Sequence, residues 1–379
     1  MKRKIRMGMV GGGPGAFIGG VHRMTARLDG KIELVCGAFS SDPAKSKSMA
    51  EELFLPAKRC YDSYDIMFEA ESRLPPGDRM DFVSIVTPNV RHFDIAMKAL
   101  DHGFHVVCDK PMTFDFSQAQ CLHKKVMESG LLFCVTYNYT AYPMVKQAKA
   151  MVAGGVLGEL RKIIAEYSLG WLAAPNAGKQ ATWRVDPLQA GSTACMGDIG
   201  THSENLIRYV TGLEIEALCS DLSTFVKGRT LDDDGSVMLR FKGGAKGLIH
   251  ASEVYTGEEN RLSLKVCGSK GSIVWNQETP DELTVKTNDA PMQVLRRGWA
   301  GTFPELGKFT RIPAGHPEGF LEAFANIYNE FATAVDARLR NATYQADFPT
   351  VDDGLHGMLF LKRVIESNQS ASKWTPFAL

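Results

Sequence analysis

The sequence predicts an α/β fold in two domains: a doubly wound parallel sheet and, after it, an α+β domain with an open, mostly antiparallel sheet. Up to about residue 140, apolar strand-like runs alternate with helix-like runs, and later strand-like segments follow one another through short turns. The length of 379 residues also exceeds what one compact core usually holds. We therefore assign residues 1–140 to the first domain and residues 141–379 to the second.

Five apolar runs in the first domain lack the polar alternation of a half-exposed strand. They lie at residues 5–10, 32–39, 81–87, 105–108 and 131–136. Between two of them, residues 92–100 place apolar side chains three and four positions apart, which predicts a helix. Apolar strands separated by helices are typical of a parallel sheet that is covered on both faces.

The second domain begins with a predicted helix at 141–153, a strand at 162–168 and a long polar loop through Arg184. Strand-like segments with hairpin turns follow, and two helices at 319–338 and 353–367 complete the domain. The strand candidates are residues 236–241, 247–254, 261–267, 272–275 and 282–287. Successive strands joined by short turns predict a mostly antiparallel sheet.

The composition argues against several classes of function. The 43 basic and 43 acidic residues cancel, so the chain lacks the positive charge typical of proteins that bind nucleic acid or anionic membranes. The eight cysteines form no C-x-x-C pair, which argues against zinc ribbons and dithiol redox sites. The sequence contains no run of about 18 apolar residues, so we expect no membrane span. We expect a reduced, cytoplasmic protein.

A glycine-rich loop, VGGGPGA at residues 10–16, directly follows the first predicted strand. Glycines allow a tight turn and a close backbone approach to a pyrophosphate, whose charge the N–H groups of the next helix accept. This position predicts a dinucleotide site, although a plain tight turn has the same composition. The stretch from Pro14 to Gly20 is longer than usual before the helix, so Gly11 and Gly13 are the favoured contacts.

The end of the second predicted strand bears on the choice between NAD and NADP. An acidic residue usually binds the ribose 2′-hydroxyl of NAD there, but the sequence is AFSSD at residues 38–42, with no carboxylate at the expected place. Ser40, Ser41 and Lys45 have the chemistry to accept a 2′-phosphate, whereas Asp42 is positioned to cap the next helix. The predicted cofactor is therefore NAD or NADP, with Ser40 among its contacts.

Two further segments make the pattern specific. The first contains Thr87-Pro88-Asn89 and, after another strand, Asp109-Lys110-Pro111; the second is GDIGTH at residues 197–202. With the glycine loop, in this order and spacing, they resemble the family of glucose–fructose oxidoreductase, inositol dehydrogenase and MocA. The ordered similarity extends to about residue 212, and the later part agrees in architecture alone. The resemblance implies a Rossmann domain, a nicotinamide cofactor, and hydride transfer to or from a sugar, inositol or similar polyol.

The resemblance also implies roles for single residues of the first domain. Lys110 matches the lysine of the family's Glu-Lys-Pro motif, which lies beside the nicotinamide and the reacting hydroxyl. Asp109 stands where glutamate is usual, so a carboxylate is kept but extends less far toward the cofactor. Thr87, Pro88 and Asn89 match the strand end that lines the dinucleotide.

In the second domain, Asp198 and His202 match the family's Asp-x-x-x-His pair. Oxidation of a secondary alcohol needs a base for the hydroxyl proton, and residues four apart on a helix share one face. The glycines beside them suggest a helix start, where the dipole helps to keep an imidazole neutral. We expect His202 to be the general acid/base, Lys110 to contact the substrate oxygen, and Asp198 to bind the substrate or orient the base.

Several polar residues are further candidates for contacts with the substrate. Arg184 resembles the arginine of a tryptophan–arginine pair in the family, Asn138 directly follows a strand of the first domain, and His316 precedes a long helix. The complete set of substrate candidates is Asn138, Arg184, Thr201 and His316. The run Asp232-Asp233-Asp234-Gly235 lacks the bidentate glutamate of a calcium loop and is interpreted as a solvated turn.

Other functions stay open beside the dehydrogenase. Some relatives use tightly held NAD for a transient oxidation, in a redox-neutral glycosidase or lyase-like reaction that these motifs do not distinguish. A non-catalytic dinucleotide sensor would need the glycine loop but not Lys110, Asp198 and His202. Asp198 and His202 also suit two metal ligands, but no third ligand is suggested, so no metal is expected. By resemblance we expect a homodimer or homotetramer.

Overall fold

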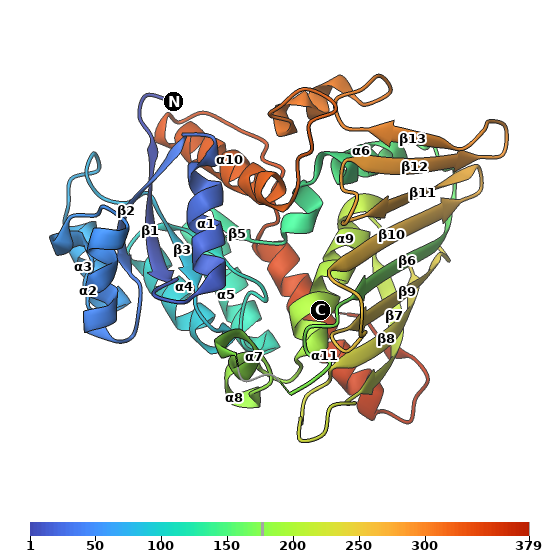
Figure 1. Ribbon diagram of the computed structural model, residues 1–379, viewed down its shortest axis with the longest axis horizontal. Helices are drawn as coiled ribbons and strands as arrows, with labels where there is room; N and C mark the ends of the chain where they lie inside the picture. The colour runs from blue at the N-terminus through green and yellow to red at the C-terminus, as the bar shows by residue number, and fades with distance from the viewer. Residues whose placement is uncertain (176–177, 379) are drawn as a thin grey trace. The chain divides into compact units, whose positions relative to one another are not determined.

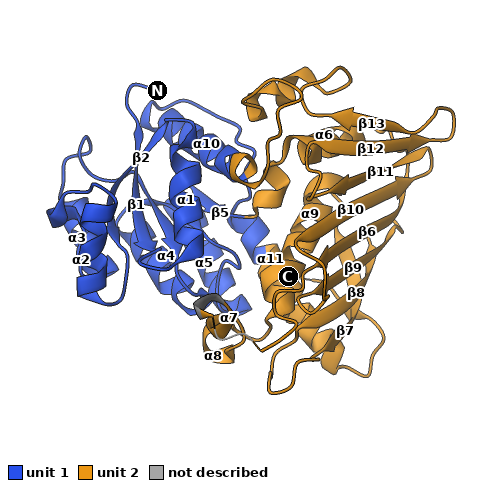
Figure 2. Cartoon of the chain, viewed as in Figure 1, with its two compact units in different colours: residues 1–136, 324–355 blue, residues 137–323, 356–379 orange. Residues whose placement is uncertain are grey.

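The structure, a computed structural model, describes residues 1–175 and 178–378. The chain forms two compact units (Figure 2). They comprise Met1–Thr136 with Phe324–Leu355 (unit 1) and Tyr137–Ala323 with His356–Leu379 (unit 2). Unit 1 holds a parallel sheet and unit 2 a mostly antiparallel one, so the predicted fold class is confirmed. Among the described residues, no helix is long and apolar enough to cross a membrane.

The sheet of unit 1 has five parallel strands in the order β2-β1-β3-β4-β5 (Figure 1). All residues of β3 are buried, and because successive side chains point to opposite faces, both faces of the sheet are covered. Each strand corresponds to one of the five predicted apolar runs. The strands are β1 (Ile5–Gly11), β2 (Ile32–Ala38), β3 (Phe82–Val86), β4 (His105–Cys108) and β5 (Phe133–Val135).

Helices connect these strands, and the one predicted at residues 92–100 is confirmed as α4. The glycine loop lies between β1 and α1, where a doubly wound domain places its phosphate-binding turn. The helices are α1 (Phe17–Leu28), α2 (Pro43–Glu52), α3 (Tyr64–Ser72), α4 (His92–Asp101) and α5 (Phe116–Ser129).

A segment from far along the chain completes the core of unit 1. It enters on α10 (Phe320–Leu339), most of which belongs to this unit. The hydroxyl of Tyr328 lies 2.6 Å from Nδ1 of His22, 306 positions away in the sequence, and 2.9 Å from Oγ of Ser84. The ring of Phe331 packs edge-on against that of Phe82, with 5.2 Å between the ring centroids. The core of unit 1 is therefore not built from the first 136 residues alone.

The sheet of unit 2 has nine strands in the order β13-β12-β11-β10-β6-β9-β8-β7-β14. Figure 1 shows the part of this order from β13 to β9. The pair β6 and β9 in the middle is parallel, and the other neighbours are antiparallel. The strands are β6 (Leu160–Ser168), β7 (Ile215–Ser223), β8 (Asp234–Phe241), β9 (Lys246–Ser252), β10 (Arg261–Gly268), β11 (Gly271–Asn276), β12 (Glu282–Thr287), β13 (Gln293–Arg296) and β14 (Thr375–Pro376).

One face of this sheet is packed and the other is partly exposed. In β8, Val237 and Leu239 are buried, whereas Met238 between them is exposed. Helix α9 packs on β6, β9 and β10, and α6 packs on β11 and β12. Alternating burial of this kind is typical of an antiparallel sheet with helices on a single face. The helices of unit 2 include α6 (Pro143–Ala153), α9 (Thr201–Thr211) and most of α11 (Val351–Gln369).

The prediction of an unbroken loop through Arg184 was wrong. Helix α7 (Lys179–Arg184) ends at that residue, and α8 (Pro187–Ala190) follows. Asp186 caps α8 by accepting a hydrogen bond from the N–H of Leu188. Aspartate followed by proline is a common helix start, but helices of one or two turns are too short for apolar periodicity to indicate them.

Candidate active site

The glycine loop turns at the end of β1 in unit 1. Gly11 has a φ of +87°, and a Cβ there would lie 2.8 Å from the carbonyl oxygen of Val86. A Cβ on Gly13 would lie 2.5 Å from the carbonyl oxygen of Phe39. Both distances are shorter than real side chains tolerate, so the loop passes the ends of two neighbouring strands only because these residues are glycine. At Gly15, an added Cβ would meet no described atom within 4 Å.

Helix α1 begins directly behind this loop with its first N–H groups uncapped. The N-cap residue is Ala16, whose side chain has no oxygen to accept a hydrogen bond, and the first turn contains no acidic residue. The open side of Gly15 and the uncapped helix start fit a phosphate group, which the N–H groups and the helix dipole both favour. The loop therefore suits the pyrophosphate of a dinucleotide.

The polar residues after β2 are engaged with one another. The carboxylate of Asp42 accepts hydrogen bonds from the N–H groups of Ala44 and Lys45, at 2.9 and 3.4 Å, so the predicted cap of α2 is confirmed. Oγ of Ser40 accepts a hydrogen bond from the N–H of Asp42 at 3.1 Å. Nζ of Lys45 lies 3.8 Å from the same carboxylate. A negative charge thus stands beside Ser40.

The segment Thr87-Pro88-Asn89 follows β3 directly. Oγ1 of Thr87 is buried and has no hydrogen-bond partner within the described chain, which suits contact with a bound ligand. The ring of His92 lies behind this segment, with Nε2 at 2.9 Å from the carbonyl oxygen of Thr87 and Nδ1 at 2.8 Å from that of Pro111. Burial lowers the pKa of His92. His92, the first residue of α4, therefore ties together the segments that follow β3 and β4.

Asp109 and Lys110 follow β4 at the same edge of the sheet. Oδ1 of Asp109 accepts hydrogen bonds from the backbone N–H of Lys110 at 2.9 Å and from the hydroxyl of Thr136 at 2.7 Å. These bonds fix the carboxylate between the ends of β4 and β5. Lys110 is half-buried there. The carboxyl edge of a doubly wound sheet is where such domains bind their ligands.

In unit 2, Asp198 and His202 lie on one continuous helix, as predicted, but two details differ. The helix starts at Cys195 with a π-helical turn (η4, Met196–Gly200) and continues as α9. This turn is wider than the α-helical turn assumed from the sequence, because its hydrogen bonds span five residues. The helix also begins well before His202, so the expected dipole effect on this imidazole does not apply beyond the first turn.

The start of this helix is capped by a residue from a distant segment. The two carboxylate oxygens of Asp232 accept hydrogen bonds from the N–H groups of Ala194 and Met196, at 2.9 and 2.8 Å. Burial raises the pKa of Asp232, and its hydrogen bonds oppose the rise. Asp232 and Asp233 are both buried, so the interpretation of this run as a solvated turn was wrong. Spacing alone gave no sign that it caps another segment.

Asp198 forms an ion pair with Arg184, whose Nε lies 2.9 Å from Oδ2 of the carboxylate. The guanidinium group lies 4.5 Å from the ring centroid of Trp183 and 5.6 Å from that of Trp171. Both charged side chains are largely but not fully buried. Two of the predicted site residues, one from α7 and one from η4, are therefore in direct contact.

His202 is buried among tyrosine rings. Its ring centroid lies 4.7 Å from that of Tyr139, 5.7 Å from that of Tyr137 and 6.2 Å from that of Tyr167. The hydroxyls of Tyr139 and Tyr167 are 2.5 Å apart, and Tyr167 also donates to Oδ1 of Asn260. Burial raises the pKa of both tyrosines, so their hydroxyls stay protonated. This enclosure was missed from the sequence, although two of the tyrosines flank the predicted residue 138.

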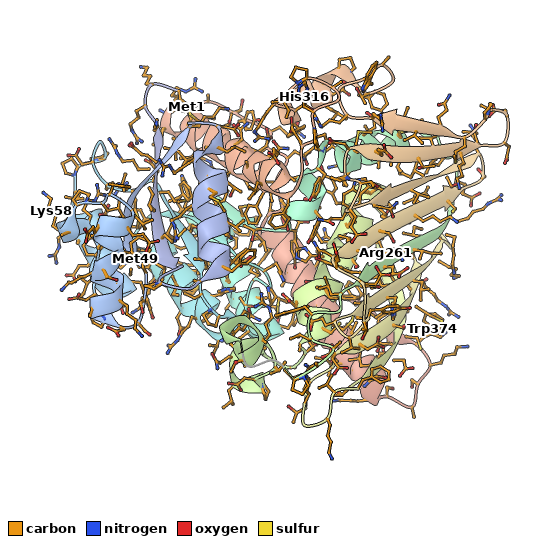
Figure 3. All side chains as sticks on the ribbon, in the orientation of Figure 1. Met1, Met49, Lys58, Arg261, His316 and Trp374 are labelled. Atoms are coloured by element: carbon orange, nitrogen blue, oxygen red, sulfur yellow. The ribbon has the colours of Figure 1, made fainter. Side chains whose placement is uncertain are left out.

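The other predicted substrate residues lie in different surroundings. Asn138 is buried, and its Nδ2 has no hydrogen-bond partner in the described part of the chain, which suits a ligand. Thr201 is fully buried, and its hydroxyl donates to the carbonyl oxygen of Gly197 at 3.2 Å, within the helix. His316, labelled in Figure 3, is exposed, with Nδ1 3.2 Å from the carbonyl oxygen of Pro313.

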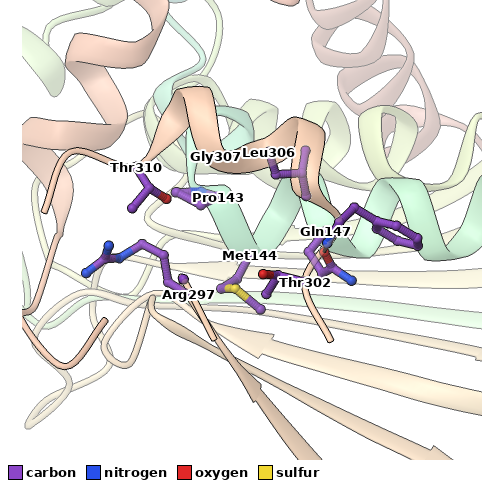
Figure 4. A pocket seen from close by; sticks show the side chains of 10 residues that line it. Pro143, Met144, Gln147, Arg297, Thr302, Leu306, Gly307 and Thr310 are labelled. Carbon is purple, nitrogen blue, oxygen red and sulfur yellow. Dashed lines mark hydrogen bonds between the residues drawn. The ribbon is translucent and has the colours of Figure 1, made fainter. Parts of the chain in front are cut away.

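Unit 2 also contains two hollows. One, of about 110 Å³, lies beside α6 and is lined by Met144, Gln147 and Arg297 (Figure 4). It is smaller than the roughly 300–1,000 Å³ of typical ligand pockets. The other, of about 710 Å³, is lined by Asp234 and Ser252 among others. Neither lining includes the Asp–His pair among the described residues, so these hollows are separate from the group around the helix.

Comparison with known proteins identifies the family. Residues 5–137 match the model of an oxidoreductase family with an NAD-binding Rossmann fold, and residues 145–274 match the GFO/IDH/MocA C-terminal domain. An uncharacterized oxidoreductase of Bacillus subtilis, YfiI, is 33% identical over 100% of this chain and 98% of its own. The chain therefore belongs to the GFO/IDH/MocA oxidoreductase family, which confirms the resemblance found in the sequence motifs.

Several relatives are named for a sugar or cyclitol, or were crystallised with one. An inositol dehydrogenase homologue from Azotobacter vinelandii, crystallised with NADH and myo-inositol, is 35% identical, with a TM-score of 0.94 over 99% of this chain and 98% of that one. The levoglucosan dehydrogenase of Pseudarthrobacter phenanthrenivorans is 29% identical over 78% of this chain and 79% of its own. The chain is accordingly an oxidoreductase of this family with an NAD-binding Rossmann domain.

Proposed function

We propose that this family member oxidises a secondary hydroxyl of a cyclitol or sugar with NAD and catalyses the reverse reduction. The observation that carries the proposal is the helix of unit 2 on which Asp198 is held by Arg184 and His202 is enclosed by tyrosines. An acid–base residue in a water-poor aromatic enclosure, with a fixed carboxylate on the same helix, suits proton transfer to and from an alcohol.

Each of three residues has a distinct role in this proposal. His202 takes the proton of the substrate hydroxyl during oxidation and returns it during reduction. Lys110 of unit 1 donates a hydrogen bond to the substrate oxygen and stabilises the negative charge that develops there. Asp198, positioned by Arg184, orients the substrate for transfer. When bound, NAD supplies the acceptor for the hydride that leaves the same carbon.

The cofactor would be held by unit 1. Gly11 and Gly13 shape the turn for the pyrophosphate, and the unpartnered Oγ1 of Thr87 provides a polar contact at the end of β3. We propose NAD rather than NADP, because Asp42 places a carboxylate beside Ser40 and pairs with the nearby lysine. A 2′-phosphate there would be repelled by this negative charge.

A polyol is the substrate class that the polar groups of unit 2 support. The unpartnered Nδ2 of Asn138 and the guanidinium of Arg184 are donors for hydroxyl oxygens. The Azotobacter homologue bound to myo-inositol is similar over almost the whole chain, which favours a cyclitol over an aliphatic alcohol.

We further propose that the chain forms a homo-oligomer through the partly exposed face of the unit 2 sheet. Ile164, Leu248 and Met238 stand on neighbouring strands of this face as directly paired residues. They form an apolar row on an otherwise mixed surface. Rows of this kind are more typical of subunit interfaces than of exposed sheets. Light scattering of wild type and of Leu248→Glu tests it: the substitution should reduce the mass to that of a monomer.

The proposed reaction is tested by calorimetry and a substrate screen. Titration with NAD and NADP should show tighter binding of NAD. Sugars and cyclitols are then screened for absorbance of the reduced nicotinamide, with Lys110→Ala and His202→Ala as controls that still bind NAD. A polyol that reduces NAD in the wild type but in neither variant supports the proposal. Tight NAD binding without net reduction by any polyol would contradict it.

A further inference from the structure

A second acidic side chain lies beside the Asp–His helix and has no role in the mechanism above. Glu253 directly follows β9 and is fully buried, at 0% exposure. Its backbone is fixed on both sides: its N–H donates to the carbonyl oxygen of Asp233 at 2.9 Å, and its carbonyl accepts from the N–H of Leu172 at 3.1 Å. Within the described chain, neither of its carboxyl oxygens meets an N–H or O–H donor.

The polar neighbour of this carboxyl group is another carboxyl group. Strand β9 packs against η4, and the carboxyl group of Glu253 at the end of β9 interacts electrostatically with that of Asp198. Two ionised carboxylates have no proton to share and repel each other, so this contact is a hydrogen bond only if one of them is protonated. A proton held by one of the two carboxyl groups would remove this repulsion.

The surroundings place this proton on Glu253. Asp198 accepts a hydrogen bond from the guanidinium of Arg184, which favours its charged form, and its side chain is 17% exposed, whereas Glu253 is fully buried. Burial raises the pKa of Glu253 well above its ordinary value, the charge of Asp198 raises it further, and Arg184 opposes the rise.

The remaining acidic neighbours do not compete for this role. Asp232 faces the same pair, but its oxygens are used by the N–H groups that it caps. Burial and these carboxyl groups raise the pKa of the Cys195 thiol well above its ordinary value, so it adds no charge. Among the described residues, Arg184 is the cation whose charge most strongly opposes the rise, and one cation cannot neutralise three ionised carboxylates in a buried space.

We propose that Glu253 is a positioning residue that stays protonated and donates its O–H to Asp198. Asp198 is then held by two donors, from α7 and from the end of β9, and remains ionised on the helix that carries His202. The role of Asp198 in turnover rests on the proposed function, whereas the proton on Glu253 does not. The two ideas can therefore fail separately.

Infrared spectroscopy tests the proton directly on the intact protein, without substrate. At pH 7, the difference spectrum of wild type minus Glu253→Gln should contain the C=O stretching band of a protonated carboxylic acid. The band should shift when glutamate, but not aspartate, carries a ¹³C-labelled side-chain carboxyl. It should also shift in Asp198→Asn, because the acceptor changes. No such band, or a band that follows the aspartate label, would overturn the proposal.

Kinetics with matched variants test the positioning role. Glu253→Gln keeps an N–H donor for Asp198, whereas Glu253→Met has a similar size but no donor. With a polyol found in the screen, kcat of Glu253→Met should be about tenfold to hundredfold below that of Glu253→Gln, with equal NAD affinity. Equal kcat in two folded variants would overturn the role, and thermal unfolding establishes that both are folded. Should Glu253→Met not fold, the band shift in Asp198→Asn still decides whether Glu253 donates to Asp198, and an unchanged band would overturn the contact.

Discussion

Two helices of this protein begin in opposite ways. In unit 1, α1 starts behind the glycine loop at Ala16, which offers its first N–H groups no acceptor. In unit 2, the helix that carries Asp198 and His202 starts against Asp232, whose carboxylate takes two N–H groups. The N–H groups at the start of α1 are therefore available to an anion, whereas those at the start of the second helix are bound by a side chain of the protein. A helix N-terminus is thus a binding site only where the chain provides no cap.

The difference separates two kinds of function. In the proposed function, the uncapped helix contributes backbone N–H groups to the cofactor site, and the capped helix contributes the side chains of Asp198 and His202, the first of which lies in the π-helical turn. We therefore expect substitutions at the start of α1 to change cofactor affinity with little effect on the catalytic step. Substitutions on the capped helix should slow the catalytic step with little effect on cofactor affinity.

The largest effect is expected for His202→Ala. Loss of the general acid/base should reduce kcat with a polyol by about 10²–10⁴-fold, because proton transfer then depends on water. The dissociation constant for NAD, measured by calorimetry, should stay within about twofold of the wild type, since α1 is unchanged. His123→Ala, a surface histidine paired with Asp352, is the matched control. A loss of NAD affinity together with kcat would contradict the expectation that this helix affects catalysis but not cofactor binding.

His22 on α1 should make the free energy of unfolding depend on pH. Burial lowers the pKa of His22 on α1 to about 4, from 6.5 for an exposed histidine. Between these pH values the unfolded chain binds a proton that the folded chain does not, so stability falls as pH decreases. His22 should account for about 3 kcal/mol of the loss at pH 4. Urea unfolding at pH 7 and 4 should show a smaller loss for His22→Gln; an equal loss would refute this assignment.

Removing the internal cap should cost stability without affecting the cofactor. Asp232→Asn keeps one acceptor oxygen, so the N–H of Ala194 or Met196 loses its partner in a buried place. The free energy of unfolding in urea should fall by about 1–3 kcal/mol. Asp42→Asn, at the exposed cap of α2, should cost less than about 1 kcal/mol. Equal costs would show that burial of the cap is unimportant.

The smallest effect is expected from giving α1 the cap that it lacks. Ala16→Asp places a carboxylate where the proposed pyrophosphate binds, and the extended backbone of this residue suits a cap. The affinity for NAD should fall about tenfold, through repulsion and competition for the same N–H groups. Ala16→Asn competes without the charge and should lose less. Unchanged affinity in both variants would place the pyrophosphate elsewhere.

The parts of the site that depend on local sequence could be predicted. The five strands of unit 1 are continuous apolar runs, and the cap at Asp42 follows from the residue type next to a proline. Gly11 and Gly13 could be singled out because their loop directly follows a strand. In each case the physical cause lies within a few residues of the feature.

The remaining parts depend on segments that meet only in the folded chain. The π-helical turn forms where Asp232 satisfies N–H groups more than 30 positions before it, and no spacing rule connects the two. The burial that protonates Glu253 is equally invisible in the sequence, where the residue ends an ordinary strand. The error about the dipole at His202 has the same origin, because the start of the helix depends on the distant cap.

The position of α10 late in the sequence affects how unit 1 folds during synthesis. Tyr328 and Phe331 join His22, Ser84 and Phe82 in one core, so the first unit stays unfinished until residues beyond 331 have left the ribosome. During that interval, nearly the whole of unit 2 is already synthesised. Until then, the emerging chain exposes the apolar surface that α10 later covers, and exposed apolar surface of this kind favours aggregation.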